Sequence, residues 1–562
     1  MKTFHPRTAS KAASLALSLL AASLVRVSAA DFNWSSTSDG DWSALANWGE
    51  AERVPGSDFP TNVDAVTLGT GGFVFPFDGE EAETRTIAIG TGEAFTLGAL
   101  TFRGGEVGNP QNYEITGPGK LIFDSGSADP ATLSLGAIYQ ASSPTVSPRV
   151  HQISANIEVH GALTISIAGQ GNARNPIISG SITGNGIDPV KLSIGGGGSL
   201  ATLVLASTGN DFKGGEVEVR NAAGITINGN SLKGATLRFS GTDSLVDKRV
   251  AFSGISSSTT FDFVRMIVEA SGYIDVLPSG LGQTLDWQSI EIADGKTLSI
   301  RKGTNSIFRI SGAGKTLSLG SNSLFVVEQQ NGTRGNTVSL ENGTVLEGNG
   351  TVTTRRNNTG AHRFHVGTGG IADPGLGEGA IGTLTFGSLT DNETNIVFQE
   401  GSTLRMQLNG LSAGAEHDQL VVAAGNFTLE ETGSGVALSL SVDYRYAATD
   451  TLTLINVAGT GEEPGAVFTG TFAGLEEGAL VNMGLWGGNP ATARISYFGG
   501  DGNDIVLTDF SVVPEPGTYA LLGLGSLAAL LRRRRKIGWR IAPLPGPSAA
   551  ASVRSDGRGF GV

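Results

Sequence analysis

The segment LVLASTGNDFKGGEVEV, residues 203–219, contains two short apolar runs separated by a stretch rich in glycine and asparagine. Residues 203–205 are apolar, and Val217 and Val219 alternate with glutamates. Alternation with a period of two predicts a β-strand with one buried face and one solvated face. Gly209-Asn210 and Gly214-Gly215 are residue types that turns favour. The segment therefore predicts two strands joined by a tight corner.

The same alternation recurs along the chain. Residues 163–168 and 404–408 alternate apolar and polar side chains. The longest such run has apolar or aromatic residues at every second position, namely Val436, Leu438, Leu440, Val442 and Tyr444. No comparable stretch with the 3.6-residue period of a helix appears between residues 63 and 512. The body of the protein is therefore predicted to be all-β.

Recurring Thr-Leu pairs suggest a repeat length. Leu298 and Leu317 lie 19 residues apart, and Leu384 and Leu404 lie 20 apart. Repeats of roughly 20 to 25 residues, each with two or three short strands and glycine corners, are typical of a solenoid. We predict a right-handed parallel β-helix with on the order of 20 coils, each advancing about 4.8 Å. A run of β-sandwiches is the alternative, and it would show more hairpin turns.

Several motifs resemble the autotransporter-associated β-strand repeat. Residues 203–219 are similar to one such unit, with an apolar strand, a Gly-Asn-x-aromatic turn, Gly-Gly and a second strand. Residues 348–352, 374–375, 382–386, 417–420 and 497–504 resemble its closing section. The resemblance implies a β-solenoid in an exported protein and implies little about activity.

Composition narrows the classes of partner. The chain has no cysteine, which excludes a disulfide framework and cysteine metal sites. The formal net charge is −14, and residues 1–30 and 532–562 carry +4 and +7, so the body between them carries −25. An acidic body argues against nucleic acid and anionic lipid as partners.

The first 30 residues read as a signal peptide with a signal helix. Lys2, Arg7 and Lys11 precede an apolar run over residues 12–25. Small residues at 28–30 predict cleavage between Ala30 and Asp31. The chain is therefore expected to be exported.

Three of the six tryptophans, Trp34, Trp42 and Trp48, fall within residues 31–62. Because the open end of a stack of coils needs covering, we interpret this region as an N-terminal cap in which the indoles form a buried plug. An exposed aromatic platform that binds sugar is the alternative.

A second targeting segment lies near the C-terminus and has three parts. The first is an extended motif, Val513, Pro514, Glu515, Pro516 and Gly517. The second is a short apolar helix that includes Ala520, Leu521, Leu522, Leu524, Leu527, Leu530 and Leu531. The third is a basic cluster of Arg532, Arg533, Arg534, Arg535 and Lys536. Basic residues stay on the cytoplasmic side of a membrane.

In this order, the three parts resemble a PEP-CTERM sorting signal. The resemblance implies that the segment holds an exported protein in the inner membrane as a transient transmembrane helix. It also implies that an exosortase-type transpeptidase then processes the chain near Pro514-Glu515-Pro516. A permanent tail anchor and a buried hairpin helix are the alternatives. The resulting division is a signal peptide (1–30), a cap (31–62), a solenoid (63–400), its C-terminal β-rich section (401–512), the sorting signal (513–536) and a disordered tail (537–562).

Few residues suggest chemistry. Residues 499–507 fit a calcium-binding nonapeptide, with Asp501 and Asp504 as weak calcium candidates, but one copy favours a tight turn. His362 and His365 are predicted to point to opposite faces of a strand, and His417-Asp418 has no nucleophile motif beside it. Acid pairs at 80–81, 430–431, 462–463 and 476–477 lie beside glycine or proline, as solvated turn residues do. We predict no catalytic residue, no metal site and no cofactor apart from the calcium candidate.

The sequence thus predicts a non-enzymatic protein of the outer surface or extracellular matrix of a bacterium with two membranes. The expected partners are an exosortase-type processing enzyme, the inner membrane during a transient contact, and exopolysaccharide. The expected setting is a biofilm or the cell envelope. Two rivals remain, an adhesin that binds carbohydrate and a β-helical polysaccharide lyase or hydrolase.

Overall fold

The computed structural model describes a subset of the chain. These are residues 30–49, 51–57, 63–69, 83–103, 111–136, 150–167, 175–196, 202–221, 224–228, 231–243, 248–255, 258–261, 263–278, 284–302, 307–329, 337–355, 363–387, 395–458, 466–513 and 516–535. They fall into two compact units, residues 1–481 with 493–510, and residues 482–492 with 511–562. The predicted signal helix and the tail at 537–562 lie outside the described residues.

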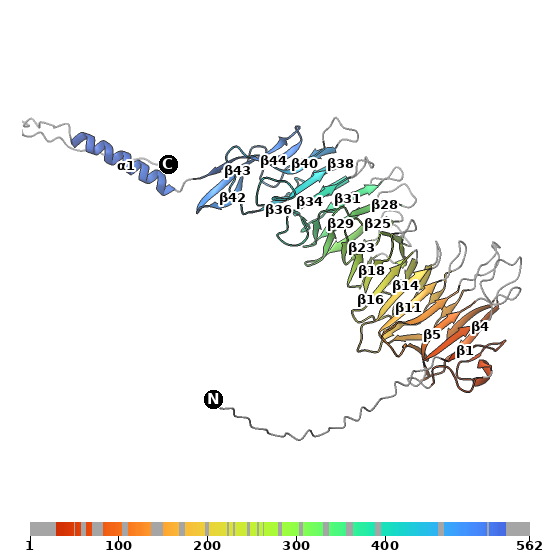
Figure 1. The fold of residues 1–562 in the computed structure, drawn as a ribbon. Coiled ribbons are helices and arrows are strands. Elements are labelled where there is room, and N and C mark those ends of the chain that lie inside the picture. The colour runs from red at the N-terminus through yellow and green to blue at the C-terminus, as the bar shows by residue number, and fades with distance from the viewer. Residues whose placement is uncertain are drawn as a thin grey trace, which may run out of the picture. The chain divides into compact units, whose positions relative to one another are not determined.

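The first unit is a stack of coils whose strands pair in parallel with the strands of the next coil, as Figure 1 shows. The strands form three sheets. The first sheet contains β1 (Asp31–Asn33), β3 (Asp64–Leu68), β5 (Ala94–Phe102), β7 (Lys120–Phe123), β8 (Ala131–Leu135), β10 (Asn156–Val159), β11 (Ala162–Ile167), β13 (Ile182–Gly184), β14 (Lys191–Gly196), β16 (Glu216–Arg220), β18 (Thr236–Ser240), β21 (Arg265–Val268), β24 (Ser289–Ile292), β27 (Thr316–Leu319), β30 (Val345–Gly348), β33 (Ile371–Pro374), β36 (Thr403–Leu408) and β39 (Ala437–Val442).

The second sheet lies one corner further along each coil. Its parallel strands are β2 (Gly40–Asp41), β4 (Glu83–Ala88), β6 (Gln111–Thr116), β9 (Gln152–Ile153), β12 (Ile177–Ile178), β15 (Thr202–Leu205), β17 (Gly224–Asn228), β19 (Lys248–Ile255), β22 (Gly272–Pro278), β25 (Thr297–Lys302), β28 (Leu324–Gln329), β31 (Thr351–Arg355), β34 (Thr383–Phe386), β37 (Gln419–Val422) and β40 (Leu452–Val457).

In the described residues, a third sheet begins near residue 258. It contains β20 (Ser258–Thr260), β23 (Thr284–Trp287), β26 (Ile307–Ser311), β29 (Thr337–Glu341), β32 (Arg363–Val366), β35 (Asn395–Phe398), β38 (Gly425–Leu429) and β41 (Ala466–Thr469). From there on each coil passes through all three sheets. The predicted all-β parallel solenoid is therefore confirmed.

The core is a set of columns in which one apolar residue from each coil stacks on the next. In β16, Val217 and Val219 are fully buried, whereas the two glutamates between and before them face outward. One column of the first sheet runs through Leu192, Val217, Leu237, Met266, Ile290, Leu317 and Leu346. Every member is at most 1% exposed, so the burial of these columns is the main favourable contribution to the fold.

The predicted repeat length was too short. Leu298 lies in β25 of the second sheet, whereas Leu317 lies in β27 of the first, so their spacing does not measure a coil. In the first sheet, true neighbours are between 20 residues apart (Val217 and Leu237) and 36 apart (Leu121 and Ile157). The described second sheet accordingly contains 15 coil strands, β2 to β40, rather than about 20.

The three tryptophans form a buried plug in the first coil, as the cap interpretation predicts. Trp34, Trp42 and Trp48 are at most 3% exposed, and Trp48 ends a short 3₁₀-helix, η1 (Leu45–Trp48). The rings of Trp34 and Trp42 contact that of Trp48 edge-on, at 5.0 and 4.9 Å between centroids. The Nε1–H of Trp48 donates to the carbonyl of Trp42 at 2.7 Å. Because Asp31–Asn33 already pairs with β3, the plug is part of the stack itself.

An ion pair fixes the loop that follows the plug. The guanidinium of Arg53 donates to both carboxylate oxygens of Asp64, each at 2.5 Å, and Gly56 N–H donates to the same carboxylate at 2.7 Å. Asp64 is fully buried, so these bonds replace its lost hydration.

At the other end of the first unit the chain reverses. The strand β44 (Asp504–Val512) pairs antiparallel with β40, so that Leu452 lies opposite Leu507. The preceding strands are β42 (Leu480–Trp486) and β43 (Asn489–Gly499). The second unit contains the adjoining parts of β42, β43 and β44, followed by the helix α1 (Pro516–Arg535). There, Val513 N–H donates to the carbonyl of Pro490 at 2.7 Å.

Candidate functional site

The C-terminal segment is the strongest candidate site, and its centre is the helix α1. Pro516 occupies the first helical position, where its missing N–H is not needed and its fixed φ suits a helix. Leucine and alanine dominate the following turns and favour helix formation. Arg532 to Arg535 occupy the last turn, where positive charge interacts favourably with the helix dipole. The predicted short C-terminal helix is confirmed.

The leucines of α1 are exposed where side chains are described. Leu522, Leu524, Leu527, Leu530 and Leu531 are each more than half exposed. Such a row of apolar side chains on a single helix is a surface that water solvates poorly.

The expectation of a transmembrane helix is not met. Within the described part of the chain, no helix is both long enough and apolar enough to cross a membrane. The arginines are the reason, since they occupy the last turns of α1 and leave only a short apolar run before them.

The remaining predicted sorting residues flank α1 in the sequence, and the predicted cleavage residues lie at the start of the stack. Pro514, Glu515 and Lys536 lie outside the described residues. Ala30 precedes β1 directly, and its carbonyl accepts a hydrogen bond from Ala65 N–H at 2.9 Å. Asp31 is exposed at the first position of β1. The predicted cleavage point therefore coincides with the start of the coil stack.

The calcium candidates lie in a hairpin turn. Gly502 N–H donates to the carbonyl of Gly499 at 2.7 Å in the turn between β43 and β44. Asp504 accepts a hydrogen bond from Val457 N–H at 2.8 Å, and burial raises the pKa of its carboxyl. Among the described residues, no group of three or more acids or histidines could hold a metal ion. The turn interpretation thus accounts for this motif.

His417 and Asp418 are adjacent but serve separate backbone contacts. His417 Nδ1 lies 3.1 Å from the carbonyl of Gly410. The carboxylate of Asp418, fully buried, accepts from Gly382 N–H at 2.8 Å and from Gln407 N–H at 2.7 Å. Burial raises the pKa of Asp418 to about 7, against the opposing effect of these two donors. The pair joins neighbouring coils and is not arranged as a base with its orienting acid.

The other predicted polar candidates are dispersed, and so is a further buried histidine, His151. Burial lowers the pKa of His151 to about 3 and that of His365 to about 4, so both are neutral. Glu431 accepts from the hydroxyl of Thr471 at 3.0 Å, and Glu477 accepts from Tyr497 N–H at 2.7 Å. His362 and the acid pairs at 80–81 and 462–463 lie outside the described residues.

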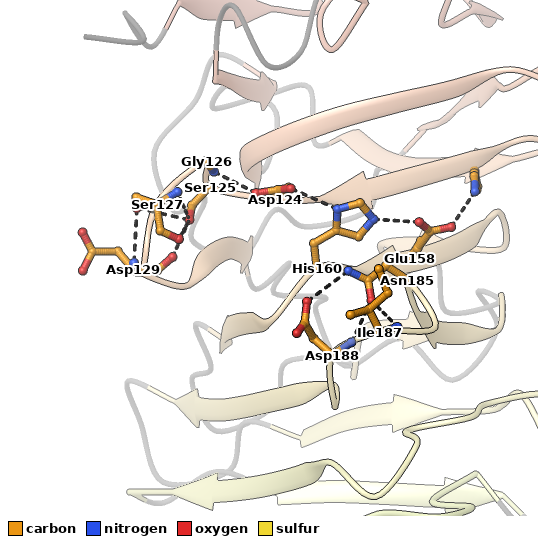
Figure 2. Close-up of polar contacts among 11 residues, drawn as sticks. Asp124, Ser125, Gly126, Ser127, Asp129, Glu158, His160, Asn185, Ile187 and Asp188 are labelled. Carbon is orange, nitrogen blue, oxygen red and sulfur yellow. Dashed lines mark hydrogen bonds and ion pairs between the residues drawn. The ribbon is translucent and has the colours of Figure 1, made fainter. Parts of the chain in front are cut away.

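Sequence reasoning missed a clamp around His160, which Figure 2 shows. The imidazole lies between the carboxylates of Asp124, 3.0 Å from Nδ1, and Glu158, 2.7 Å from Nε2. Lys120 completes the cluster at 2.5 Å from Glu158. Burial alone would lower the pKa of His160, but the hydrogen bonds to Glu158 and Asp124 outweigh it and raise that pKa. Asp124 follows β7 and His160 follows β10, so only the pairing of these strands brings them together.

Asn210 was noticed as a turn residue, but its bonds across three coils were not foreseen. Its side-chain oxygen accepts from Ile182 N–H at 2.7 Å, and its amide donates to the carbonyl of Ser231 at 2.7 Å. It is only 2% exposed. A buried asparagine beside the fully buried Phe212 therefore ties the preceding and following coils together at this corner.

One comparison with known proteins bears on function. Residues 512–536 match the PEP-CTERM protein-sorting motif, which begins at the last residue of β44 and includes all of α1. No curated protein matches the chain. The match indicates a protein that an exosortase-type system sorts to the cell surface. The resemblance to autotransporter-associated repeats stays a prediction.

Proposed function

We propose that this protein is a non-enzymatic structural component of the bacterial surface or extracellular matrix. The observation that carries the proposal is the sorting motif at residues 512–536, which begins at the last residue of β44. A folded β-stack is thereby joined to a segment that an exosortase-type enzyme recognises. Sorting and folding reside in separate parts of the chain.

In this proposal, α1 holds the exported chain at the inner membrane only until processing. Residues 520–531 would extend about 18 Å as a helix, against a hydrocarbon core of roughly 30 Å. The arginines remain in water at the end of this apolar run. A short contact of this kind suits temporary retention better than a permanent anchor. Processing near Pro514-Glu515-Pro516 then separates the coil stack from α1.

The role outside the cell is mechanical and interfacial. Parallel pairing between successive coils gives an interior strand such as β16 a hydrogen-bonded neighbour on each side, without any disulfide. The acidic body favours solubility and disfavours polyanionic partners. We propose that the stack resides in exopolysaccharide or biofilm.

The two rival functions receive less support. An adhesin that used Trp34, Trp42 and Trp48 as a sugar platform would need exposed rings, and all three are buried. An enzyme of the lyase or hydrolase class would need acids from adjacent coils to converge. The described acid pairs instead hydrogen-bond to nearby backbone and hydroxyl groups.

Cell fractionation with mass spectrometry of the mature C-terminus tests the proposal. We expect the wild-type chain on the cell surface, ending upstream of α1. The triple variant Pro514→Ala, Glu515→Ala, Pro516→Ala should remain with the inner membrane and keep its full C-terminus.

A matched triple variant provides the control. Replacing Pro543, Pro545 and Pro547 with alanine removes a similar number of prolines downstream of the sorting motif, and it should leave sorting unchanged. Recovery of surface protein that still contains residues 520–562 would overturn the proposal.

A further inference from the structure

The last strand of the first sheet, β39, has an open edge. It pairs with β36 on one side, and no described strand pairs with its other side. By contrast, the last parallel strand of the second sheet, β40, is covered by the antiparallel strand β44. An open edge presents a row of unpaired backbone groups that can pair with another strand.

The apolar side chains of β39 are less buried than those of the coil before it. Leu404, Met406 and Leu408 in β36 are fully buried, whereas their register partners Leu438, Leu440 and Val442 are only partly buried. These three residues therefore lack the covering that a further coil would provide.

The edge also lacks the devices that prevent strand addition. Residues 436–442 read VALSLSV, without a charge, a proline or a glycine. Charged residues, prolines and bulges are the usual protection of an exposed edge. Among the described residues, the backbone bond to this edge is at its first position, where Ala473 N–H donates to the carbonyl of Val436. No described strand pairs with the open side of residues 438–442, which we take as available to a partner strand.

We propose that β39 pairs antiparallel with β39 of a second copy of this chain, about a two-fold axis through Leu440. The alternation of the strand makes it self-complementary. Leu440 would face Leu440 of the second copy, Leu438 would face Val442, and Ser439 would face Ser441. Apolar residues meet on the core side and hydroxyls meet on the outer side, with no like charges opposed.

The backbone geometry fits this register. Ala437 N–H donates to the carbonyl of Ser402, just before β36, and Asp443 N–H donates to that of Leu408, the last residue of β36. Because backbone groups alternate between the two sides of a strand, the N–H and C=O of residues 438, 440 and 442 point to the open edge. In the proposed register these residues form the hydrogen-bonded pairs, so the first sheet would continue from one copy into the next. This inference is independent of how the chain is sorted.

Charge substitutions on the outer side of β39 test the proposal in solution. The full-length chain should show concentration-dependent dimerisation in sedimentation experiments. The variant Ser439→Glu, Ser441→Glu should dimerise roughly tenfold more weakly or worse, because it sets glutamates opposite glutamates. Thr164→Glu, Ser166→Glu on the interior strand β11 is the matched control and should dimerise as the wild type. Since α1 is common to all these chains, any association through it cancels in the comparison.

A variant with the opposite charges tests whether dimerisation can be restored. Mixing the double-glutamate variant with Ser439→Lys, Ser441→Lys should restore dimers, now of mixed composition. A wild-type chain that stays monomeric at every concentration would overturn the proposal. Dimers that the β39 charges weaken no more than the β11 charges would overturn it as well.

Cysteine cross-linking tests the register, because the natural chain has no cysteine. Opposed residues on antiparallel strands lie about 4.5–5.5 Å apart at Cα, within the range for a disulfide. A mixture of Ser439→Cys and Ser441→Cys chains should form mixed disulfides faster than Ser166→Cys chains cross-link. Equal rates would overturn the pairing.

Discussion

Replacing Trp42 with alanine should open the first coil without unfolding the rest of the stack. Trp42 is fully buried, stacks on Phe95 at 5.7 Å between centroids, and donates from Nε1 to the carbonyl of Pro55 at 3.2 Å. The substitution removes these contacts and leaves a cavity beneath Trp48.

The magnitude follows from the cavity. Tryptophan-to-alanine substitutions in a core cost about 3–5 kcal/mol, and the end of a stack can collapse only partly onto the gap. A loss of about 4 kcal/mol raises the open population of the first coil roughly a thousandfold. Because each coil of a solenoid contacts only its neighbours, the effect should fade within a coil or two.

Hydrogen exchange measured by mass spectrometry detects the opening of the first coil directly. The amide of Trp34 donates to Thr67 and the amide at position 42 donates to Ala88, so both exchange only when the first coil opens. Peptides covering residues 31–48 should exchange faster by up to about a thousandfold. Peptides from β24 to β30 should be unchanged.

The control is Trp287→Ala, an equally buried indole in β23 near the middle of the stack. It should increase exchange around β23 and leave residues 31–48 protected. If Trp42→Ala changes exchange at residues 31–48 by less than about tenfold, the plug does not stabilise the end of the stack.

Asn210→Ala should lower the free energy of unfolding by about 2–4 kcal/mol, because it leaves the buried N–H of Ile182 and the buried carbonyl of Ser231 without partners. Thermal melting measures the effect, and the control Asp211→Ala should change the melting temperature little. The difference in melting temperature between the wild type and His160→Gln should be largest below about pH 6. This difference should shrink as the pH rises. Folding raises the pKa of His160 above its unfolded value of about 6.5, so the protonated imidazole stabilises the folded state fully below that unfolded pKa. The stabilisation is lost as the pH passes the raised pKa of the folded state. Arg53→Ala should lower the free energy of unfolding, measured by urea denaturation, by about 3 kcal/mol, because it removes the charged partner of the buried Asp64 carboxylate. An unchanged urea midpoint would show that the hydrogen bond from Gly56 N–H is enough to stabilise that carboxylate.

Local features of the sequence predicted local structure well. The alternation at 216–219 correctly assigned the buried and exposed faces of β16, and the glycines at 499–502 correctly indicated a turn. The leucine-rich run before Arg532 correctly indicated a helix. Each of these depends on contacts within a few residues.

The spacing of coils could not be predicted in the same way. Strand pairs fix which coils are neighbours, but the corners between strands differ in length and leave no periodic pattern. Leu298 and Leu317 look like successive repeats, yet they belong to different sheets. The clamp around His160 and the interlocking of Asn210 depend on residues 21 to 36 positions away, so the sequence does not reveal them.

By itself, the sequence determined the strand faces, the all-β class and the sorting segment, because periodicity and the linear order of short motifs are properties of neighbouring residues. The tertiary structure decided the register of the coils, the burial of the tryptophans, the partners of Asp418 and the open edge of β39. These four features depend on hydrogen bonds between strands that are distant in the sequence. The free energy that favours this arrangement over others comes from the stacking of whole coils.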